Sequence, residues 1–505
     1  MSDTPRVLLI NPTITGKRHA RFPLAVLSLS TALEGRHAPT ILDGNIDRDF
    51  VATAVRTVRD GSIAAVGVTV MGGPQLLSAI AVSKAIRASA PATPIVWGGA
   101  FPTVCPEATV RAPYVDYAVR SQGEETLKEL LEVLRTGAHE ALPAIRGLSW
   151  TGDDGCVVHN PERAFSAASL GQMLPYDRLD NPRQYLTRTY LGARTAGYQA
   201  ALGCRFRCTF CGVAAMFRGK TALPLADRLE QDLTFLRERL GVDAIQFYDH
   251  NFFDREVDMV PLLEVMARLE MPWWCFARSD ALANLSERSW SLVRKSRLRM
   301  AYIGAESPSD WLLHDIRKGT RSDQTLAAIE QCRSHGVIPE LSFMLAPPQD
   351  PEGETERTFE FIRTIKRLHP ATEVMIYIYT PLPMRRDNTN AAAARAAATL
   401  RDASGEPVVF PATADEWAEP EWVSYWCHKD APWLSADLRR RIVDFTTVLG
   451  CRFPTIMDVR ASSWGKAALR GLAAWRYRYQ RYHNPWELRV SRKLIRQWDP
   501  RVLSL

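Results

Sequence analysis

The sequence predicts an α/β protein with two α/β units and a helical C-terminal region. Short β-branched runs alternate with helix-length amphipathic segments over the first 140 residues, and the same alternation returns from about residue 195 to 385. Residues 405–505 have a helical pattern instead. At 505 residues the chain is too long for one hydrophobic core, so roughly two to four domains are expected.

The first unit, residues 1–140, is predicted to fold as a doubly wound parallel sheet. Its expected strands are residues 6–12, 40–45, 64–70, 94–99 and 115–120. Ligands bind such sheets outside the carboxyl ends of the strands, near the point where the strand order reverses. The unit has no GxGxxG pattern, so binding of a nicotinamide or flavin dinucleotide is not indicated.

The segments directly after these strands are the candidate ligand contacts of the first unit. Glycine in four of the five lets the backbone approach a ligand closely, although turn formation alone also favours glycine there. The candidates are Asn11, Pro12, Asn45, Thr69, Val70, Met71, Gly72, Gly98, Gly99, Ala100, Phe101, Gly123 and Glu124.

The rest of the chain divides into three further segments. Residues 141–190 are predicted to be a connector with a small hairpin that turns at Asp-Asp-Gly. Residues 191–387 are the second α/β unit. Its expected strands lie within residues 198–202, 244–250, 273–280, 299–307, 339–345 and 373–382. Residues 388–505 begin with an alanine-rich helical or flexible join and hold eight of the fourteen tryptophans.

Composition indicates an ordinary globular protein. The apolar fraction is 46% and the charged fraction 24%, and no apolar run is long enough to span a bilayer. The N-terminus lacks the apolar region of a secretory signal, so a cytoplasmic location is expected, where thiols stay reduced. Nine scattered cysteines, an odd number, do not indicate a disulfide framework.

Positive charge is concentrated at the C-terminus. Residues 461–505 contain ten Lys and Arg against Glu487 and Asp499, which is a surplus of eight in a chain whose net charge is +7. Such a region suits an acidic substrate, a nucleic acid or a membrane surface, and a solvated helical face is the equally weighted alternative.

The most specific pattern is GCRFRCTFCG, with Cys204, Cys208 and Cys211 in the loop after the first strand of the second unit. Four-ligand zinc sites usually combine two spaced pairs. Iron–sulfur clusters are also held by thiolates, usually four. Three thiolates would leave one iron open to an exogenous molecule, whereas a zinc site completed by a distant residue is the less favoured alternative.

Cys275 is not expected to be a fourth ligand. The period of two in a strand places Trp274, Phe276 and Arg278 on one face and Cys275 on the other, towards the helices if Arg278 faces inward. The remaining cysteines have no close cysteine partner and are interpreted as small apolar residues.

CRFRCTFC after a strand resembles the cluster motif of the radical S-adenosylmethionine (SAM) superfamily. The strand-end pieces TVMGGP, WGGAFPT and VRSQGEETLKEL resemble those of the cobalamin-binding domain fused to a subset of these enzymes. The resemblance covers about residues 5–385. It implies a Rossmann-like cobalamin-binding domain over 1–140 and a partial (β/α)6 TIM-type barrel over 191–387.

The resemblance also implies roles for individual residues. Cys204, Cys208 and Cys211 would ligate a [4Fe-4S] cluster whose open iron binds SAM through its amino and carboxylate groups. The strand-end residues of the first unit would contact cobalamin. The implied SAM contacts are Phe210, Asp249, Asn251, Arg278 and Glu306.

The sequence departs from the family pattern at three places. Asn45 stands where another class of cobalamin proteins supplies an axial histidine, and Phe101 stands where relatives often have histidine. We therefore expect residues 1–140 to bind cobalamin with its dimethylbenzimidazole tail displaced from the metal and with no protein side chain below the cobalt. The strand end LAPP lacks its usual glycine. The transfer-RNA methylthiotransferases are resembled less, because they carry three further cysteines in the N-terminal domain and only Cys105 lies there.

The implied activity is that of a cobalamin-dependent radical SAM methyltransferase, which abstracts hydrogen with a 5′-deoxyadenosyl radical and donates methyl from methylcobalamin. A cobalamin-dependent oxidative cyclase or ring-rearranging enzyme is the first alternative, and a non-catalytic cobalamin or redox sensor is the second. Tyr302, Tyr377 and Tyr379 are pocket candidates by strand parity, with a core role equally weighted.

Partners follow from the same resemblance. A small molecule, of natural-product or tetrapyrrole-like type, is the expected substrate, and flavodoxin or ferredoxin the expected electron donor. No nucleic acid is expected, and a peripheral membrane contact would use the basic C-terminal region.

Overall fold

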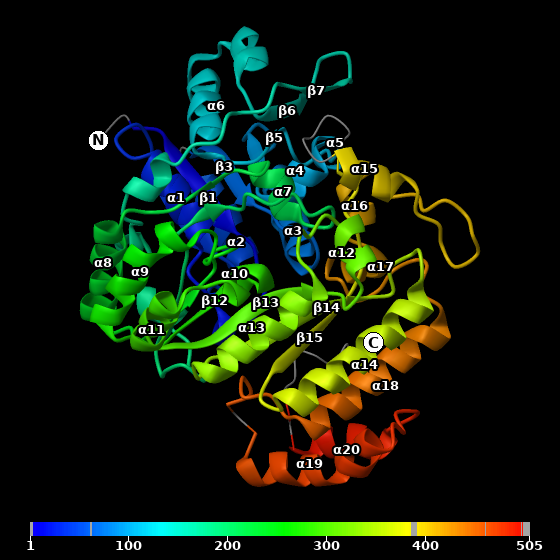
Figure 1. Ribbon diagram of the computed structural model, residues 1–505. Helices are drawn as coiled ribbons and strands as arrows, with labels where there is room; N and C mark the ends of the chain where they lie inside the picture. Colours follow the sequence, from blue (N-terminus) through cyan, green and yellow to red (C-terminus); the bar gives the residue numbers. More distant parts are fainter. Residues whose placement is uncertain (1–3, 61–62, 385–390, 460, 496, 498–505) are drawn as a thin grey trace.

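The computed structural model describes residues 4–60, 63–384, 391–459, 461–495 and 497. Two α/β units lie next to each other, and C-terminal helices contact both (Figure 1). In the view of Figure 1 the first unit is at the top and the last two helices are at the bottom.

The N-terminal sheet has the order β2-β1-β3-β4-β5-β6-β7. Its strands are β1 (Arg6–Asn11), β2 (Ala38–Asp43), β3 (Ile63–Thr69), β4 (Ile95–Gly98), β5 (Tyr117–Val119), β6 (Leu148–Thr151) and β7 (Val157–His159). Neighbours among β1–β5 pair in parallel, and the order reverses at β1. The doubly wound unit predicted from the sequence is confirmed.

Strand parity distributes the N-terminal core over two faces. Val7 and Leu9 of β1 pack with α1 (Leu24–Ala32) and α6 (Glu124–Thr136). Leu8 and Ile10 share the opposite cluster with α2 (Phe50–Asp60) and α3 (Pro74–Ser89). Alternate residues of one strand therefore serve both layers, as β pleating requires.

The hairpin predicted within the connector belongs to the N-terminal sheet. β6 pairs antiparallel with β5, and β7 pairs antiparallel with β6. Gly155 has φ +76°, a conformation that suits glycine in the turn between these strands. The sheet therefore continues past residue 140, where the sequence placed the end of the first domain.

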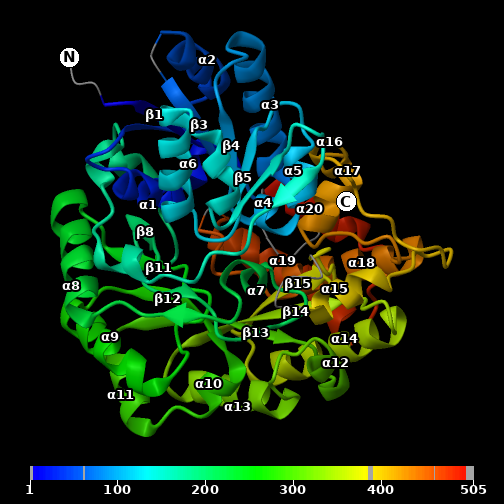
Figure 2. The ribbon, with the colours of Figure 1, turned by 90° about the horizontal axis from the view of Figure 1, so that it is seen from above.

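The second sheet has the order β15-β14-β13-β12-β11-β8, with every neighbouring pair parallel. The strands are β8 (Thr195–Tyr198), β11 (Ala244–Phe247), β12 (Trp273–Arg278), β13 (Leu298–Glu306), β14 (Ile338–Leu345) and β15 (Glu373–Ile378). The helices between them are α8 (Ala226–Phe235), α9 (Glu256–Leu269), α11 (Glu287–Lys295), α13 (Ser322–Ser334) and α14 (Pro351–Leu368). This sequential order is that of an incomplete (β/α) barrel (Figure 2).

The inner face of this sheet is aromatic. Trp274, Phe276 and Tyr302 belong to a separate cluster, whereas Cys275 lies in the main core with the surrounding helices. Cys275 therefore faces away from Trp274 and Phe276, as parity predicts.

The C-terminal helices join the two α/β units. They are α15 (Ala391–Ala398), α16 (Ala414–Trp417), α17 (Pro420–Trp426), α18 (Ala436–Arg452), α19 (Ser463–Arg478) and α20 (Trp486–Ile495). Phe445 of α18 stacks on Phe359 of α14, with ring centroids 3.8 Å apart. The helical character of this region is confirmed. Residues 388–390 of the alanine-rich join, and Arg496, Trp498, Asp499 and Arg501 of the basic tail, lie outside the described residues.

Candidate functional site

The three cysteines lie between β9 (Leu202–Gly203) and α7 (Gly212–Phe217), as the sequence predicts. Gly203 has φ +77°, and a Cβ there would collide with the backbone of Lys220 on the approach to β10 (Thr221–Ala222). The backbone N–H of Thr209 donates to the carbonyl of Ile316 (3.0 Å), which fixes the loop to the barrel. Glycine at 203 is thus required for the tight entry into the loop.

The chemistry of these thiols fits a metal cluster. Burial raises the pKa of all three, that of Cys211 to about 12, and Cys208 further raises the pKa of both Cys204 and Cys211. The three thiols would therefore ionise together only if positive charge were placed beside them, and the iron of a cluster would supply that charge. Among the described residues no group of three His, Cys, Asp or Glu side chains is arranged to hold a single metal ion.

A buried ion pair lies beside the cysteine loop. Lys318 Nζ donates to Glu306 Oε1 at 2.7 Å, and both side chains are almost fully buried. Burial opposes the charge of Lys318, but Glu306 and Cys208 outweigh it and raise the lysine pKa. Lys318 in turn lowers the pKa of the Cys208 thiol, against the effect of burial.

The backbone around Glu306 is specialised for this pair. The register with β14 shifts between Gly304 and Glu306, and Glu306 has φ +62°. A Cβ at Gly304 would collide with both Lys318 Nζ and Glu306 Oε1. A left-handed glutamate beside an obligatory glycine is strain of the kind that accumulates at ligand sites.

Arg278 connects the cysteine loop to the segment that carries Lys318. Its guanidinium carbon lies 3.5 Å from the ring centroid of Phe206, and its Nη2 donates to the carbonyl of Lys318 (2.7 Å). It also pairs with Asp280 at 3.0 Å. Arg278 thus holds the walls of the site together.

Asp249 and Asn251 support the approach to the cysteines. The fully buried Asp249 accepts a short hydrogen bond from the backbone N–H of Ala201, and burial raises its pKa to about 7. Asn251 Nδ2 donates to Asp254 at 3.2 Å. Asp249 Oδ2 and Asn251 Oδ1 have no hydrogen-bond partner, so the site keeps two buried polar atoms for a ligand. Phe210 is partly buried against the main core.

The three candidate tyrosines occupy two places. Tyr302 Oη donates to Tyr377 Oη (3.2 Å) on the aromatic inner face of the barrel. Tyr379 follows the end of β15. Burial raises its pKa to about 12, although a hydrogen bond to Thr209 of the cysteine loop lowers it. Tyr379 therefore contacts the cysteine loop, and Tyr302 and Tyr377 line the barrel.

Sequence reasoning missed Lys318 and His428. His428 follows α17, hydrogen-bonds Thr380 closely, and lies edge-on to Tyr377 with ring centroids 6.1 Å apart. Burial lowers its pKa to about 4, so the imidazole is neutral. Lys318 lies in an irregular segment and His428 in a turn, where no hydrophobic period marks them.

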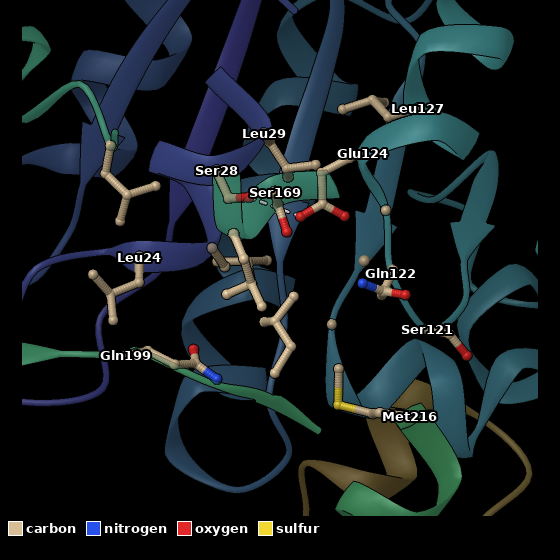
Figure 3. A pocket seen from close by; sticks show the side chains of 18 of the residues that line it. Leu24, Ser28, Leu29, Ser121, Gln122, Glu124, Leu127, Ser169, Gln199 and Met216 are labelled. Atoms are coloured by element: carbon tan, nitrogen blue, oxygen red, sulfur yellow. Dashed lines mark hydrogen bonds between the residues drawn. The ribbon is translucent and has the colours of Figure 1, made fainter. Parts of the chain in front are cut away.

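A cavity of about 340 Å³ lies between the two α/β units. Figure 3 shows Ser28, Leu29 and Glu124 of the first unit on its wall together with Gln199 and Met216 of the second. Ser28 Oγ donates to Glu124 Oε1 at 2.7 Å. The predicted contacts that line this cavity are Thr69, Gly98, Gly99, Gly123 and Glu124. His250, kept neutral because burial lowers its pKa to about 4, also lines it.

The amide of Asn45 is committed to the protein itself. Its Oδ1 accepts from the backbone N–H groups of Ile14 (2.9 Å) and Thr15 (3.0 Å), and its Nδ2 donates to Asp43 (2.7 Å). Asn45 is buried, so its side chain holds the loop after β1 rather than a ligand.

Gln75 extends this network to the ends of β1 and β3. Its Nε2 donates to Asn11 Oδ1 and to the carbonyl of Pro12, both at 3.1 Å, and its Oε1 accepts from the N–H of Met71 (2.8 Å). The loops at the switch point are therefore tied together by amides. Gln75 carried no sequence signal, since it lies inside a helix.

The loop after β3 and the start of α4 (Ala100–Val104) pack on the C-terminal helices. Val70 and Phe101 are fully buried, and Phe101 contacts the rings of Trp417 and Trp426. Both side chains are therefore packed within the protein, which a strand-end position alone does not reveal, and their predicted contact with cobalamin stays a prediction. Met71 is 49% exposed and remains available.

Gly72 shows how closely α17 approaches this edge. A Cβ at Gly72 would overlap the ring of Trp426, and one at Gly73 would lie 2.8 Å from Cys427 Sγ. Ala100 begins α4 after Gly99, whose φ is +105°. At this edge the glycines of the first unit therefore make room for Trp426 of the C-terminal region.

Comparison with known families divides the chain in the same way. Residues 20–131 match the B12 binding domain family, and residues 198–362 match the Radical SAM superfamily. An uncharacterized methyltransferase of Pyrococcus horikoshii is 25% identical over 369 residues, which covers 70% of this chain and 78% of that protein.

Two further similarities differ in coverage. An anaerobic magnesium-protoporphyrin IX monomethyl ester cyclase of Synechocystis is 23% identical over 59% of this chain, which spans only 58% of the cyclase. The radical SAM methyltransferase TsrM of Kitasatospora setae, solved with cobalamin and a [4Fe-4S] cluster bound, superposes with a TM-score of 0.67. That alignment covers 98% of this chain and 100% of TsrM at 18% identity, so it shows a common fold.

Proposed function

The chain is a B12-binding domain fused to a radical SAM domain, and we propose that it is a cobalamin-dependent methyltransferase acting on a small molecule. The observation that carries the proposal is a short chain segment that links the cavity at the first unit to the cysteine loop. Residues Tyr198, Gln199, Ala200 and Leu202 line the cavity at the first unit and lead directly to Cys204. One short segment therefore borders both candidate cofactor sites.

Cobalamin, the [4Fe-4S] cluster and SAM together supply a methyl carrier and a one-electron cleavage of SAM. In the proposal, Cys204, Cys208 and Cys211 hold the cluster. Lys318 and Glu306 offer opposite charges to the carboxylate and ammonium of the methionine end of SAM. Asp249 keeps the backbone before Cys204 in place through the N–H of Ala201.

The first unit would hold cobalamin mainly by shape. Gly98, Gly99 and Gly123 leave room for a large ligand to approach backbone, and the cavity wall is predominantly apolar around Leu24 and Leu29. The side chain of Asn45 is fully hydrogen-bonded within the protein. We therefore expect no cobalt ligand from that position.

The substrate side is the aromatic interior of the barrel. Trp274, Phe276 and Tyr302 pack edge to face there, and Tyr302 and Tyr377 present hydroxyls. Trp426 and Phe101 exclude water from the neighbouring edge of the first unit. This lining suits a flat, aromatic or tetrapyrrole-like small molecule with few charges.

Oxidative cyclisation is the second candidate, favoured by the similarity to the Synechocystis cyclase. Methyl transfer is preferred because the methyltransferase of Pyrococcus horikoshii is matched over more of both chains. A sensor is disfavoured because the buried pair of opposite charges beside the cysteines offers partners for the amino and carboxylate groups of SAM, for which a sensor has no use.

The test is a labelled turnover. Protein reconstituted with iron, sulfide and cobalamin is incubated with a reductant, SAM carrying a deuterated methyl group, and extract of its host. A product that gains the deuterated methyl supports the proposal, whereas an unlabelled product that has lost hydrogen identifies a cyclase. If SAM stays intact with every extract, and the Cys211→Ala control gives the same result, both the methyltransferase and the cyclase proposals are overturned.

A further inference from the structure

The outward face of α19 carries an apolar stripe that no part of the described chain covers. Its members recur every three or four residues and so lie on one face of the helix: Trp464, Ala468, Leu472, Trp475 and Tyr479. Trp464 is 87% exposed and Trp475 52% exposed. Single exposed apolar residues are ordinary, but a continuous aromatic stripe marks an interaction surface.

α20 carries a second stripe of the same kind. Trp486, Val490 and Leu494 follow one another at four-residue spacing, and Trp486 and Leu494 are 63% and 79% exposed. A Cβ at Gly465, near the start of α19, would contact Ile495 at the end of α20, so the helices form an antiparallel hairpin. We call residues 463–495 the terminal hairpin.

The stripes are not needed to fold the hairpin. Leu469 and Ala473 of α19 and Leu488 of α20 already pack against Val448 and Cys451 of α18. Each helix is therefore apolar on two faces, and within the described part of the chain only the inner face has a partner. In Figure 1 the hairpin lies at the end of the molecule opposite the N-terminal sheet, away from the cofactor loops.

The charges around the stripes are of one sign. Glu487 is the acidic residue of the terminal hairpin, and it pairs with Arg476. Arg489 pairs with Asp444 of α18. Within the described residues no ion pair is recorded for the exposed cations Arg470, Arg478, Arg481 and Lys493.

We propose that the terminal hairpin docks on an anionic lipid surface and lies flat in it. Tryptophan, tyrosine and leucine between exposed arginines and lysines are the composition of helices that bind the bilayer interface. The unpaired cations suit acidic headgroups. A second copy of the chain would present the same positive charges and be repelled, so self-association is disfavoured. Nowhere in the described chain is a helix long and apolar enough to cross a bilayer, so the hairpin would lie at the surface.

The test uses the full-length protein and lipid vesicles. Co-sedimentation compares vesicles of phosphatidylcholine alone with mixed phosphatidylcholine–phosphatidylglycerol vesicles. Binding is expected on the anionic vesicles, weaker at high salt, with a blue shift of tryptophan fluorescence. A W464S/W475S/W486S variant should lose binding and the shift.

A charge variant and a matched control complete the design. Each basic residue near an anionic surface contributes about 1 kcal/mol, so R470Q/R478Q/K493Q should weaken binding by about two orders of magnitude. L225S/V257S/L368S, which removes three apolar residues that are exposed elsewhere, should bind like the original protein.

Three outcomes overturn the proposal. The first is no binding to the anionic vesicles, and the second is equal binding by the tryptophan variant. The third is a dimer, or a complex with an acidic electron-transfer protein, that the tryptophan substitutions abolish while vesicle binding persists. None of these outcomes bears on the methyl-transfer proposal, because the hairpin lies apart from the cofactor loops.

Discussion

The two parallel sheets use their carboxyl edges in opposite ways. At the edge of the N-terminal sheet, glycines line the cavity, Asn45 is held by Asp43 and by backbone N–H groups, and Gln75 donates to Asn11. At the edge of the barrel sheet, thiols, Asp249 and the Glu306–Lys318 pair are buried together. One edge therefore suits recognition by shape and the other recognition by charge, although the topology is shared.

The difference has an energetic consequence. Hydrogen-bonded amides such as those of Asn45 and Gln75 make a rigid edge at little cost, because each of these two amides has partners. Buried ions are costly unless they are paired, so the barrel edge is less stable without its ligands. Substitutions at the barrel edge should accordingly have the larger effects.

The largest effect is expected from the cysteines. Replacing Cys204, Cys208 and Cys211 with alanine should remove bound iron and SAM cleavage altogether, because no other residue is proposed to hold the cluster. Cobalamin should stay bound, since its site is on the other edge. Iron analysis and visible absorption measure the two separately, and Cys156→Ala at an exposed thiol is the control. A full cluster in the triple variant would refute the assignment.

The buried ion pair should give the next largest effect. Lys318→Met leaves Glu306 buried without its cation, which should lower the free energy of unfolding by about 3–5 kcal/mol and abolish measurable SAM binding. Glu306→Gln should weaken SAM binding by about 1–3 kcal/mol.

Denaturant unfolding and calorimetric SAM titration measure these effects, with the exposed Lys295→Met as control. If Lys318→Met is as stable as Lys295→Met, the pair does not stabilise this edge.

Asp249 should make stability depend on pH. Its pKa in the folded protein is about 7 instead of 3.8, because burial favours the protonated form. The unfolded chain loses this proton first, so the free energy of unfolding falls as pH rises from 3.8 to about 7, by at most about 4 kcal/mol.

Asp249→Asn should remove this contribution. The variant should therefore gain stability relative to the original protein over that pH range, whereas the exposed Asp227→Asn should not. Equilibrium unfolding at several pH values gives the difference. A constant difference between the two proteins across the range contradicts the shifted pKa.

The smallest effect is expected at the amide edge. With Asn45 committed to Ile14, Thr15 and Asp43, and with the dimethylbenzimidazole tail of cobalamin expected to be displaced from the metal, the cob(II) state should show no nitrogen superhyperfine splitting in electron paramagnetic resonance. Free cobalamin with its own base coordinated provides the positive control. Splitting in the protein sample would show a nitrogen ligand on the cobalt. The N-terminal edge would then not bind its ligand by shape alone.

Most of the fold could be predicted from the sequence because strand parity reflects which face is buried. Each expected strand has a counterpart in the two sheets, although the first barrel strand is β8 (Thr195–Tyr198) and not residues 198–202, and Cys275 lies on the face that parity assigns. The hairpin β6–β7 was placed in a connector, because nothing local shows that a hairpin will extend a distant sheet edge.

The site was less predictable, for a physical reason. The cysteines are marked by their spacing, but Lys318 comes from an irregular segment and meets Glu306 only through a bulge in β13. Phe101 was expected at a ligand because it follows a strand, whereas tryptophans from the far C-terminal region cover it. Contacts between distant segments leave no periodic signal.

The contact of Trp426 with Gly72 and Phe101 sets an order of events during synthesis. The N-terminal unit leaves the ribosome first and folds first. Phe101 and the loop at Gly72 then remain open to water until α16 and α17 arrive, more than 300 residues later. A large cofactor therefore has an unobstructed approach to this edge in the nascent chain. Once synthesis is complete, α16 and α17 cover the edge.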